Sequence, residues 1–144
     1  MSYLVGIDLG TTNTVVYYLD PAAEQPQPEI FAVPQIVALG EVEAQSSLPS
    51  FVYLPDAEKL PEGALDLPWA SGLQTCVGAY AREIASSRPD CVVASAKSWL
   101  CADNVDRRSA LLPREQQDEA RRVSPVKALR MILEHIRDAW NHVH

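Results

Sequence analysis

The chain has 144 residues, a hydrophobic content of 47% and a formal net charge of −7 at pH 7. The apolar content is enough for the core of one domain, or of part of a larger one, and excludes a disordered chain. The acidic balance argues against a nucleic-acid surface, and no apolar run is long enough for a signal peptide or a membrane span. We therefore expect a cytoplasmic protein with neither nucleic acid nor membrane as a partner.

The first predicted element is a β-hairpin. Two apolar runs, Tyr3 to Leu9 and Val15 to Leu19, are rich in β-branched and aromatic residues, which favour strands. The segment between them contains the glycine and asparagine of a tight loop. Asp8 lies where a buried strand normally carries an apolar residue, and burying an unpaired carboxylate costs several kcal/mol. We therefore expect a metal ion, or the counter-ion of a bound ligand, beside Asp8.

Short strands and an irregular insert are predicted next. Proline and glycine residues divide the following apolar runs into three strands: Ile30–Val33, Gln35–Leu39 and Phe51–Leu54. Residues 55–75 contain Pro55, Pro61 and Pro68, which preclude a long regular element there. The sequence thus predicts that 1–54 is mostly sheet and that 55–75 is an irregular surface insert.

Short regular elements and then a polar connection are predicted after the insert. In 76–102, apolar residues from Val77 to Ala85 recur at helical spacing before Pro89, Cys91 to Ala94 can form a short strand, and "SAKSWL" a helical turn. Residues 103–123 are polar and charge-dense, which is typical of a solvated connection or a frayed helix.

An amphipathic helix is predicted over 124–144. Ser124 can act as its N-cap, with Pro125 at the first helical position. Apolar residues at helical spacing form one stripe: Val126, Leu129, Ile132, Leu133, Ile136 and Trp140. Since such a stripe must be buried, we expect this chain to self-associate if it does not cover the stripe itself. His142 and His144 are expected to be exposed.

The three cysteines are predicted to be reduced. Cys76, Cys91 and Cys101 are odd in number and lack the spacing of a metal site. We expect each to serve as a small buried apolar residue in a reducing compartment.

The hairpin loop has the composition of a phosphate-binding turn. Gly10 leaves room for backbone N–H groups, and the hydroxyls of Thr11 and Thr12 can bond phosphate or lie near a metal ion. A P-loop is excluded because no Gly-Lys-Thr follows, and a dinucleotide fold is excluded because a strand follows the loop. On spacing alone, an ordinary polar hairpin turn remains equally acceptable.

Several segments resemble one known family. "GIDLGTTNTVV" resembles the first phosphate loop of the actin-like ATPase superfamily, in particular of its Hsp70 chaperone branch. "LPSFVYL", "VGAYAREIASSRPDCVVASAKSWL" and "VSPVKALRMILEHIRDAW" are similar, in the same order, to later segments of Hsp70 proteins. The 55–75 insert and the short 103–123 stretch depart from the usual pattern, so the resemblance is to a divergent member.

The resemblance implies a fold and a set of binding residues. The fold is an α/β one, part of an actin-like (ribonuclease H-like) lobe with a mixed sheet and amphipathic helices. In the family the residue at Asp8 helps to hold Mg²⁺, mostly through water, and the residues at Gly10, Thr11, Thr12 and Asn13 grip the phosphates of ATP or ADP. The residue at Lys97 stabilises the transferring phosphoryl group.

The resemblance also implies that residues 1–144 form the amino-terminal part of a larger nucleotide-binding domain. Its second phosphate loop and adenosine pocket are expected downstream, so this piece alone should be inactive. Unfolded clients and co-chaperones would then be partners through the remainder. Two alternatives stay open: an actin-like filament protein and a small-molecule kinase of the same superfamily. The lysine segment and the "LPSFV" strand favour the Hsp70-like ATPase.

Overall fold

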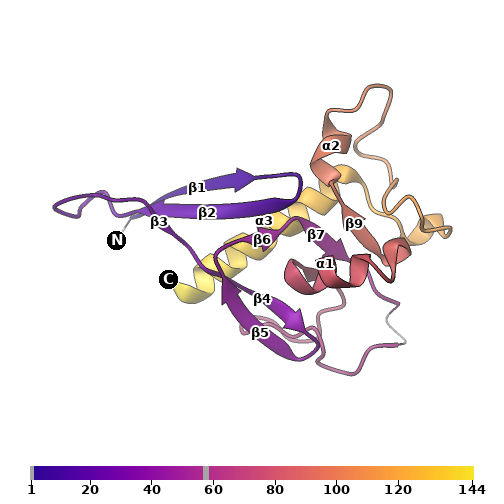
Figure 1. The fold of residues 1–144 in the computed structure, drawn as a ribbon, viewed down its shortest axis with the longest axis horizontal. Coiled ribbons are helices and arrows are strands. Elements are labelled where there is room, and N and C mark those ends of the chain that lie inside the picture. Colours follow the sequence, from indigo (N-terminus) through magenta and orange to yellow (C-terminus); the bar gives the residue numbers. More distant parts are fainter. Residues whose placement is uncertain (1, 57–58) are drawn as a thin grey trace.

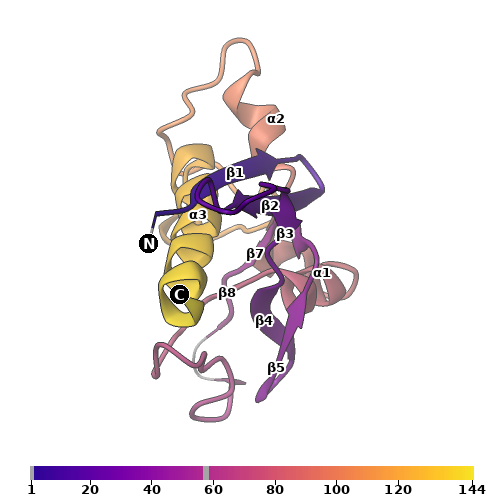
Figure 2. The same cartoon turned by 90° about the vertical axis from the view of Figure 1, so that its left-hand side faces the viewer.

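The computed structural model describes residues 2–56 and 59–144 (Figure 1). This part of the chain contains three small antiparallel sheets and three α-helices. The mixed α and β class predicted from the sequence is therefore confirmed. In two views a quarter-turn apart, the long C-terminal helix runs alongside the sheets and is in contact with more than one of them (Figures 1 and 2).

The first sheet is built on the predicted hairpin. β1 (Leu4–Leu9) and β2 (Asn13–Leu19) pair in antiparallel fashion, with Leu4 opposite Leu19 and Leu9 opposite Thr14. Two short strands pair with opposite ends of β2: β3 (Glu29–Ile30) beside Tyr17 and Tyr18, and β6 (Leu48–Pro49) beside Asn13 and Thr14. The hairpin prediction is confirmed.

The second sheet differs from the prediction. β4 (Val33–Ala38) and β5 (Glu41–Gln45) form a hairpin through Gly40, which has a positive φ of 74°. Pro34 lies inside β4 and does not separate two strands, because a two-stranded sheet leaves each strand a free edge that needs no N–H. β5 was not predicted, since its "EVEAQ" sequence is mostly polar and its residues are exposed or half-buried.

The third sheet has the order β8-β7-β9, with strands at Cys76–Val77, Phe51–Tyr53 and Val92–Ala94. The strand predicted at the Cys91 to Ala94 segment is confirmed. The preceding helix begins later than predicted: α1 spans Ala79–Ala85, and Val77 belongs to β8. Gly78 separates the two elements with a φ of 110°, a conformation that side chains rarely adopt.

A buried glutamine fixes this junction. Gln35 Nε2 donates to the carbonyls of Val33 and Ser47 at 3.2 and 3.0 Å, and its Oε1 accepts from the N–H of Ala79 at 2.9 Å. A Cβ on Gly78 would lie 2.6 Å from that Oε1 atom. The side chain therefore caps the first turn of α1 and ties it to β4.

The remaining short elements lie between long irregular stretches. α2 spans Ala96–Leu100, as the "SAKSWL" segment predicts, and two 3-10 helices span Pro89–Cys91 and Glu119–Arg121. The 55–75 insert is irregular where it is described, while residues 57 and 58 lie outside the described residues. It is not purely superficial, because Ala64 and Leu65 are buried.

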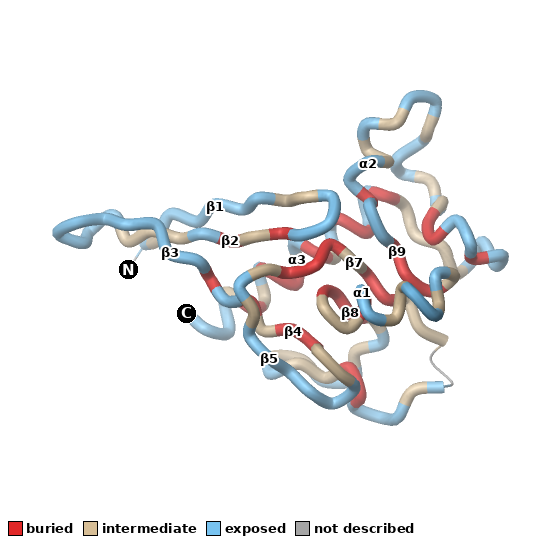
Figure 3. The backbone as a smooth tube through the Cα atoms, viewed as in Figure 1, coloured by how far each residue is buried: buried red, intermediate tan, exposed pale blue. Residues whose placement is uncertain are grey.

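The amphipathic helix predicted over 124–144 is confirmed. α3 spans Pro125–Val143, and the Ser124 hydroxyl accepts from the N–H of Lys127 at 3.0 Å as its N-cap. One face is buried against all three sheets (Figure 3). Its buried residues are Pro125, Ala128, Leu129, Ile132, His135, Ile136 and Ala139. The predicted stripe is buried only in part, because Val126 and Leu133 stay 40% and 39% exposed.

Aromatic rings join the end of α3 to the first sheet. The Trp140 ring lies 5.4 Å from that of Tyr18 and 5.2 Å from that of Phe31, both at steep angles. His144 is exposed, as expected, yet its ring stacks on Trp140 at 3.8 Å. Edge-to-face and stacked pairs of this kind add to the apolar burial that fixes the helix on the sheet.

The prediction that all three cysteines are buried is confirmed only in part. Cys76 and Cys91 are buried free thiols, as predicted, but Cys101 is exposed because it follows the last residue of α2 in a polar stretch. Burial raises the pKa of Cys76 to about 12, so this thiol stays protonated.

In the described ranges no helix has the length and apolarity needed to cross a membrane.

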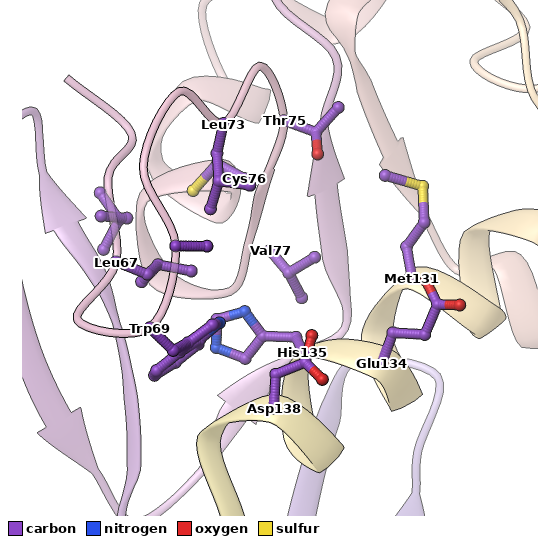
Figure 4. A pocket seen from close by; sticks show the side chains of 12 residues that line it. Leu67, Trp69, Leu73, Thr75, Cys76, Val77, Met131, Glu134, His135 and Asp138 are labelled. Atoms are coloured by element: carbon purple, nitrogen blue, oxygen red, sulfur yellow. The ribbon is translucent and has the colours of Figure 1, made fainter. Parts of the chain in front are cut away.

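His135 is the buried titratable group of α3. Its ring lines a cavity of 190 Å³ between the 67–77 segment and the helix, 5.4 Å from the Trp69 ring (Figure 4). Nε2 donates to the carbonyl of Pro34 at 2.9 Å, so this ring nitrogen carries the proton of the neutral imidazole. Burial lowers the pKa of His135, although the Pro34 carbonyl and the charge of Asp138 oppose the shift.

The lowered pKa of His135 predicts acid sensitivity. The unfolded chain takes up the proton near pH 6.5 while the folded chain resists it, so the stabilisation is complete above pH 6.5 and is lost as the pH falls through the folded pKa. His135→Gln keeps a donor for Pro34 without titrating. Urea unfolding at pH 7.5 and pH 5 should show a larger loss for the wild type than for His135→Gln. Equal losses would contradict the assignment.

Candidate functional site

The predicted site residues lie on the β1–β2 hairpin and on α2. Asp8 is the penultimate residue of β1, Gly10 to Asn13 form the turn into β2, and Lys97 lies in the first turn of α2. Figures 1 and 2 both show the hairpin turn near α2. Leu9 and Leu100 line one hollow, which brings the ends of β1 and α2 to the same place.

The expected burial of Asp8 is wrong. Its side chain is exposed, because β1 is an edge strand whose residues are exposed or half-buried throughout. An exposed carboxylate carries no desolvation penalty and so does not by itself require a cation. Its exposure does leave it accessible to a ligand bound at the turn.

The turn has a geometry that requires glycine. The N–H of Gly10 donates to the carbonyl of Asn13 at 3.0 Å, closing the loop. A Cβ on Gly10 would clash with that same carbonyl oxygen. The Gly10 amide is thus used inside the turn. Thr11 and Thr12, at its tip, are exposed and remain the residues that can present amides and hydroxyls to an anion.

Ser50 anchors the turn to the rest of the protein. Its Oγ donates to the carbonyl of Gly10 at 2.8 Å, and its N–H donates to the carbonyl of Thr12 at 2.9 Å. Since the Ser50 hydroxyl proton is used in this way, the buried Thr14 hydroxyl donates to Ser50 Oγ, 2.9 Å away. These three bonds hold the two ends of the turn on the chain that leads into β7.

Lys97 is exposed at the N-terminal end of α2. The residue before this helix, Ser95, is in the left-handed region with a φ of 55°. The neighbouring Ala96 side chain is buried in the core that α3 forms with the three sheets, so α2 is anchored at that point while Lys97 is exposed to solvent. The Lys97 side chain is therefore accessible to a ligand from solution.

The donor set suits a phosphate better than a bare metal ion. Within 2–56 and 59–144 no three His, Cys, Asp or Glu side chains converge in a way that could hold a metal. A single carboxylate, Asp8, with nearby threonine hydroxyls fits Mg²⁺ bound mainly through water and phosphate oxygens, which is its usual mode. The residues present therefore fit Mg²⁺ only when a phosphate accompanies it.

The structural role of Ser50 and Thr14 was not predicted from the sequence. Ser50 belongs to the "LPSFVYL" segment, which the sequence marks as similar to an Hsp70 strand, but neither spacing nor periodicity links it to a turn 40 residues earlier. Only the paired strands β2 and β6 bring the two segments together.

Comparison with known proteins gives no assignment. No protein-family model matches the chain, and no curated protein matches it either.

The clash at Gly10 predicts a local loss of stability. Gly10→Ala forces the Asn13 carbonyl to move, and we expect a cost of roughly 1–3 kcal/mol in the free energy of unfolding. Gly6→Ala is the matched control in the adjoining strand β1, because a Cβ there meets nothing within 4 Å. Chemical denaturation measures both. A Gly10→Ala protein as stable as Gly6→Ala would contradict the turn geometry.

The Ser50 anchor predicts coupling between two hydroxyls. Ser50→Ala leaves the Gly10 carbonyl and the Thr14 hydroxyl without their partner, at a cost of about 1–3 kcal/mol. Adding Thr14→Val to the Ser50→Ala variant removes the Thr14 hydroxyl that has lost its partner. The double variant should therefore lose less stability than the sum of the single variants, as a double-mutant cycle measures. Strict additivity would show that the two side chains do not interact.

Proposed function

We propose that residues 1–144 are the amino-terminal part of the nucleotide-binding domain of a divergent Hsp70-like ATPase of the actin-like superfamily. In this proposal the turn between β1 and β2 binds the terminal phosphates of ATP or ADP. Bound Mg²⁺ would neutralise phosphate charge on the Asp8 side of the turn.

The observation that carries the proposal is the construction of the turn. A plain hairpin loop needs no support from outside, whereas this one is closed by Gly10 and bonded at two carbonyls by Ser50. Its tip still leaves Thr11 and Thr12 exposed. A rigid turn that presents small polar residues to solvent is suited to binding an anion without reorganisation.

The proposed role of Lys97 is to stabilise negative charge on the transferring phosphoryl group. Two features support it: Lys97 is exposed, and α2 lies beside the hairpin turn. An ammonium group placed near a phosphate acts mainly in the transition state, where charge develops. Client binding and co-chaperones belong to the proposal only through a longer chain.

The proposal predicts weak, localised binding of Mg-triphosphate by these 144 residues. Without an adenosine pocket most of a nucleotide stays in water, so we expect a Kd of roughly millimolar for inorganic triphosphate with Mg²⁺. Amide shifts in ¹⁵N-edited NMR spectra should be largest at Thr11 and Thr12. Asp8→Asn should reduce the Mg²⁺ dependence of the titration.

The control for that titration is Glu43→Gln, an equal charge change on the exposed strand β5. It should titrate like the wild type. Shifts spread over other surfaces, or none near the turn, would refute a phosphate-binding role. Micromolar binding of ATP by these residues alone would refute the idea that the site needs a second half.

A further inference from the structure

The cavity beside His135 lies between two segments that are far apart in the sequence. Residues 67–77 form one side and α3 forms the other, and β4 contributes Ile36 (Figure 4). Several of the residues that line it are buried, with Ile36, Cys76 and Val77 at 1%, 4% and 6% exposure. Every lining residue lies between 36 and 138, so the described chain forms this cavity by itself.

His135 presents a hydrogen-bond acceptor to this cavity. Because Nε2 donates to the carbonyl of Pro34, Nδ1 of the neutral ring carries a lone pair. Nδ1 has no hydrogen-bond partner within 2–56 and 59–144, although the residue is only 7% exposed. No fully buried side-chain nitrogen or oxygen in those ranges lacks a partner, so Nδ1 is reached from the cavity that the ring lines. An acceptor buried to this extent is normally met by a donor.

The rest of the cavity suits a single ring. Its apolar side chains are Ile36, Leu67, Leu73, Val77 and Met131. The Trp69 ring stands at 77° to that of His135 and forms an aromatic wall (Figure 4). The volume of 190 Å³ slightly exceeds that of an apolar cavity of about 150 Å³, which admits one benzene molecule. A benzene-sized ring can therefore fit, whereas a helix about 10 Å across cannot.

Two carboxylates of α3 also line the cavity. Glu134 and Asp138 are half-buried and lie about one turn apart, on either side of His135 in the sequence. Glu134 pairs with Arg130 at 2.8 Å, and Asp138 pairs with Arg137 at 2.7 Å. The arginine side chains are 74% and 62% exposed, so water screens both pairs and the carboxylates can still attract a cation. Among the described residues, no lysine or arginine lines the cavity.

We infer that this cavity binds a small aromatic amine that carries a hydroxyl or N–H group on its ring. The ring packs beside Trp69 and donates its polar hydrogen to Nδ1 of His135. The ammonium group extends toward Glu134 and Asp138. Water alone would satisfy Nδ1 but would leave the apolar lining wetted. Burial lowers the pKa of His135, which keeps Nδ1 an acceptor at pH 7.

A free amine matches this cavity better than a side chain of a peptide or of a later segment of this chain. A tyrosine or tryptophan side chain supplies a ring with a donor but no charge, and a lysine or arginine side chain supplies the charge without an aromatic ring. Only a ligand with both groups meets the acceptor and the carboxylates together. The inference is independent of the proposed nucleotide site, because the cavity shares no residue with the hairpin turn or with α2.

The test is a titration with tyramine, followed in NMR spectra by the signals of the Trp69 indole and the His135 ring. We expect saturable binding with a Kd of roughly millimolar, as for a ligand this small. Phenethylamine lacks only the hydroxyl and should bind at least about tenfold more weakly, because Nδ1 loses its donor. 4-Hydroxyphenylacetate keeps the ring and the hydroxyl but reverses the charge, so it should also bind at least about tenfold more weakly.

Substitutions in the protein locate the binding site. Ala70→Leu fills part of the cavity and should abolish tyramine binding. Glu134→Gln combined with Asp138→Asn keeps the shape of the lining and should weaken tyramine binding about tenfold or more, which tests the site even if Ala70→Leu does not fold. Glu43→Gln combined with Glu83→Gln is the matched control, because both carboxylates are exposed and neither lines the cavity. The control should bind tyramine like the wild type.

Three results would overturn the inference. Absence of tyramine binding at millimolar concentration would show that the cavity holds water only. Equal binding of phenethylamine would show that Nδ1 of His135 does not select the ligand. Binding by these 144 residues that a longer chain of the protein lacks would assign the cavity to a later segment.

Discussion

Burial of one face of α3 is the constraint on which the rest of this fold depends. The three sheets have two to four strands each, and sheets of that size are marginally stable alone in water. Ile132 and Ile136 of α3 share one core with residues of all three: Val16 of the first sheet, Val33 of the second and Val52 of the third. Because the helix is common to every sheet, we expect them to unfold together.

This constraint also positions the proposed phosphate turn. The main core fixes β2 through Val16 and β6 through Leu48, so the two strands meet beside the turn. Ser50, which follows β6 directly, can then reach Gly10 and Thr14. The stability of the core and the geometry of the turn are thus linked, because the hydrogen bonds that shape the turn come from a segment that the core holds in place.

Local patterns predicted the elements whose causes are local. The hairpin followed from two apolar runs around a glycine loop, and α3 from its Ser124 cap and helical period. β5 was not predicted, although Val42 and Ala44 alternate with polar residues, because this five-residue segment is mostly polar and stays exposed or half-buried. The burial of Asp8 was predicted wrongly, since apolar neighbours indicate a strand but not whether another element covers it. The Ser50 anchor depends on tertiary pairing, which periodicity does not encode.

The proposed role of the turn from Gly10 to Asn13 is to bind phosphate. A crystal structure of the protein grown with Mg²⁺ and a non-hydrolysable ATP analogue tests it most directly. We expect the terminal phosphates against the amides of Thr11 and Thr12, the metal ion on the Asp8 side, and Lys97 Nζ within ion-pair distance of a phosphate oxygen. Phosphates bound at another surface, with this turn facing only solvent, would contradict it.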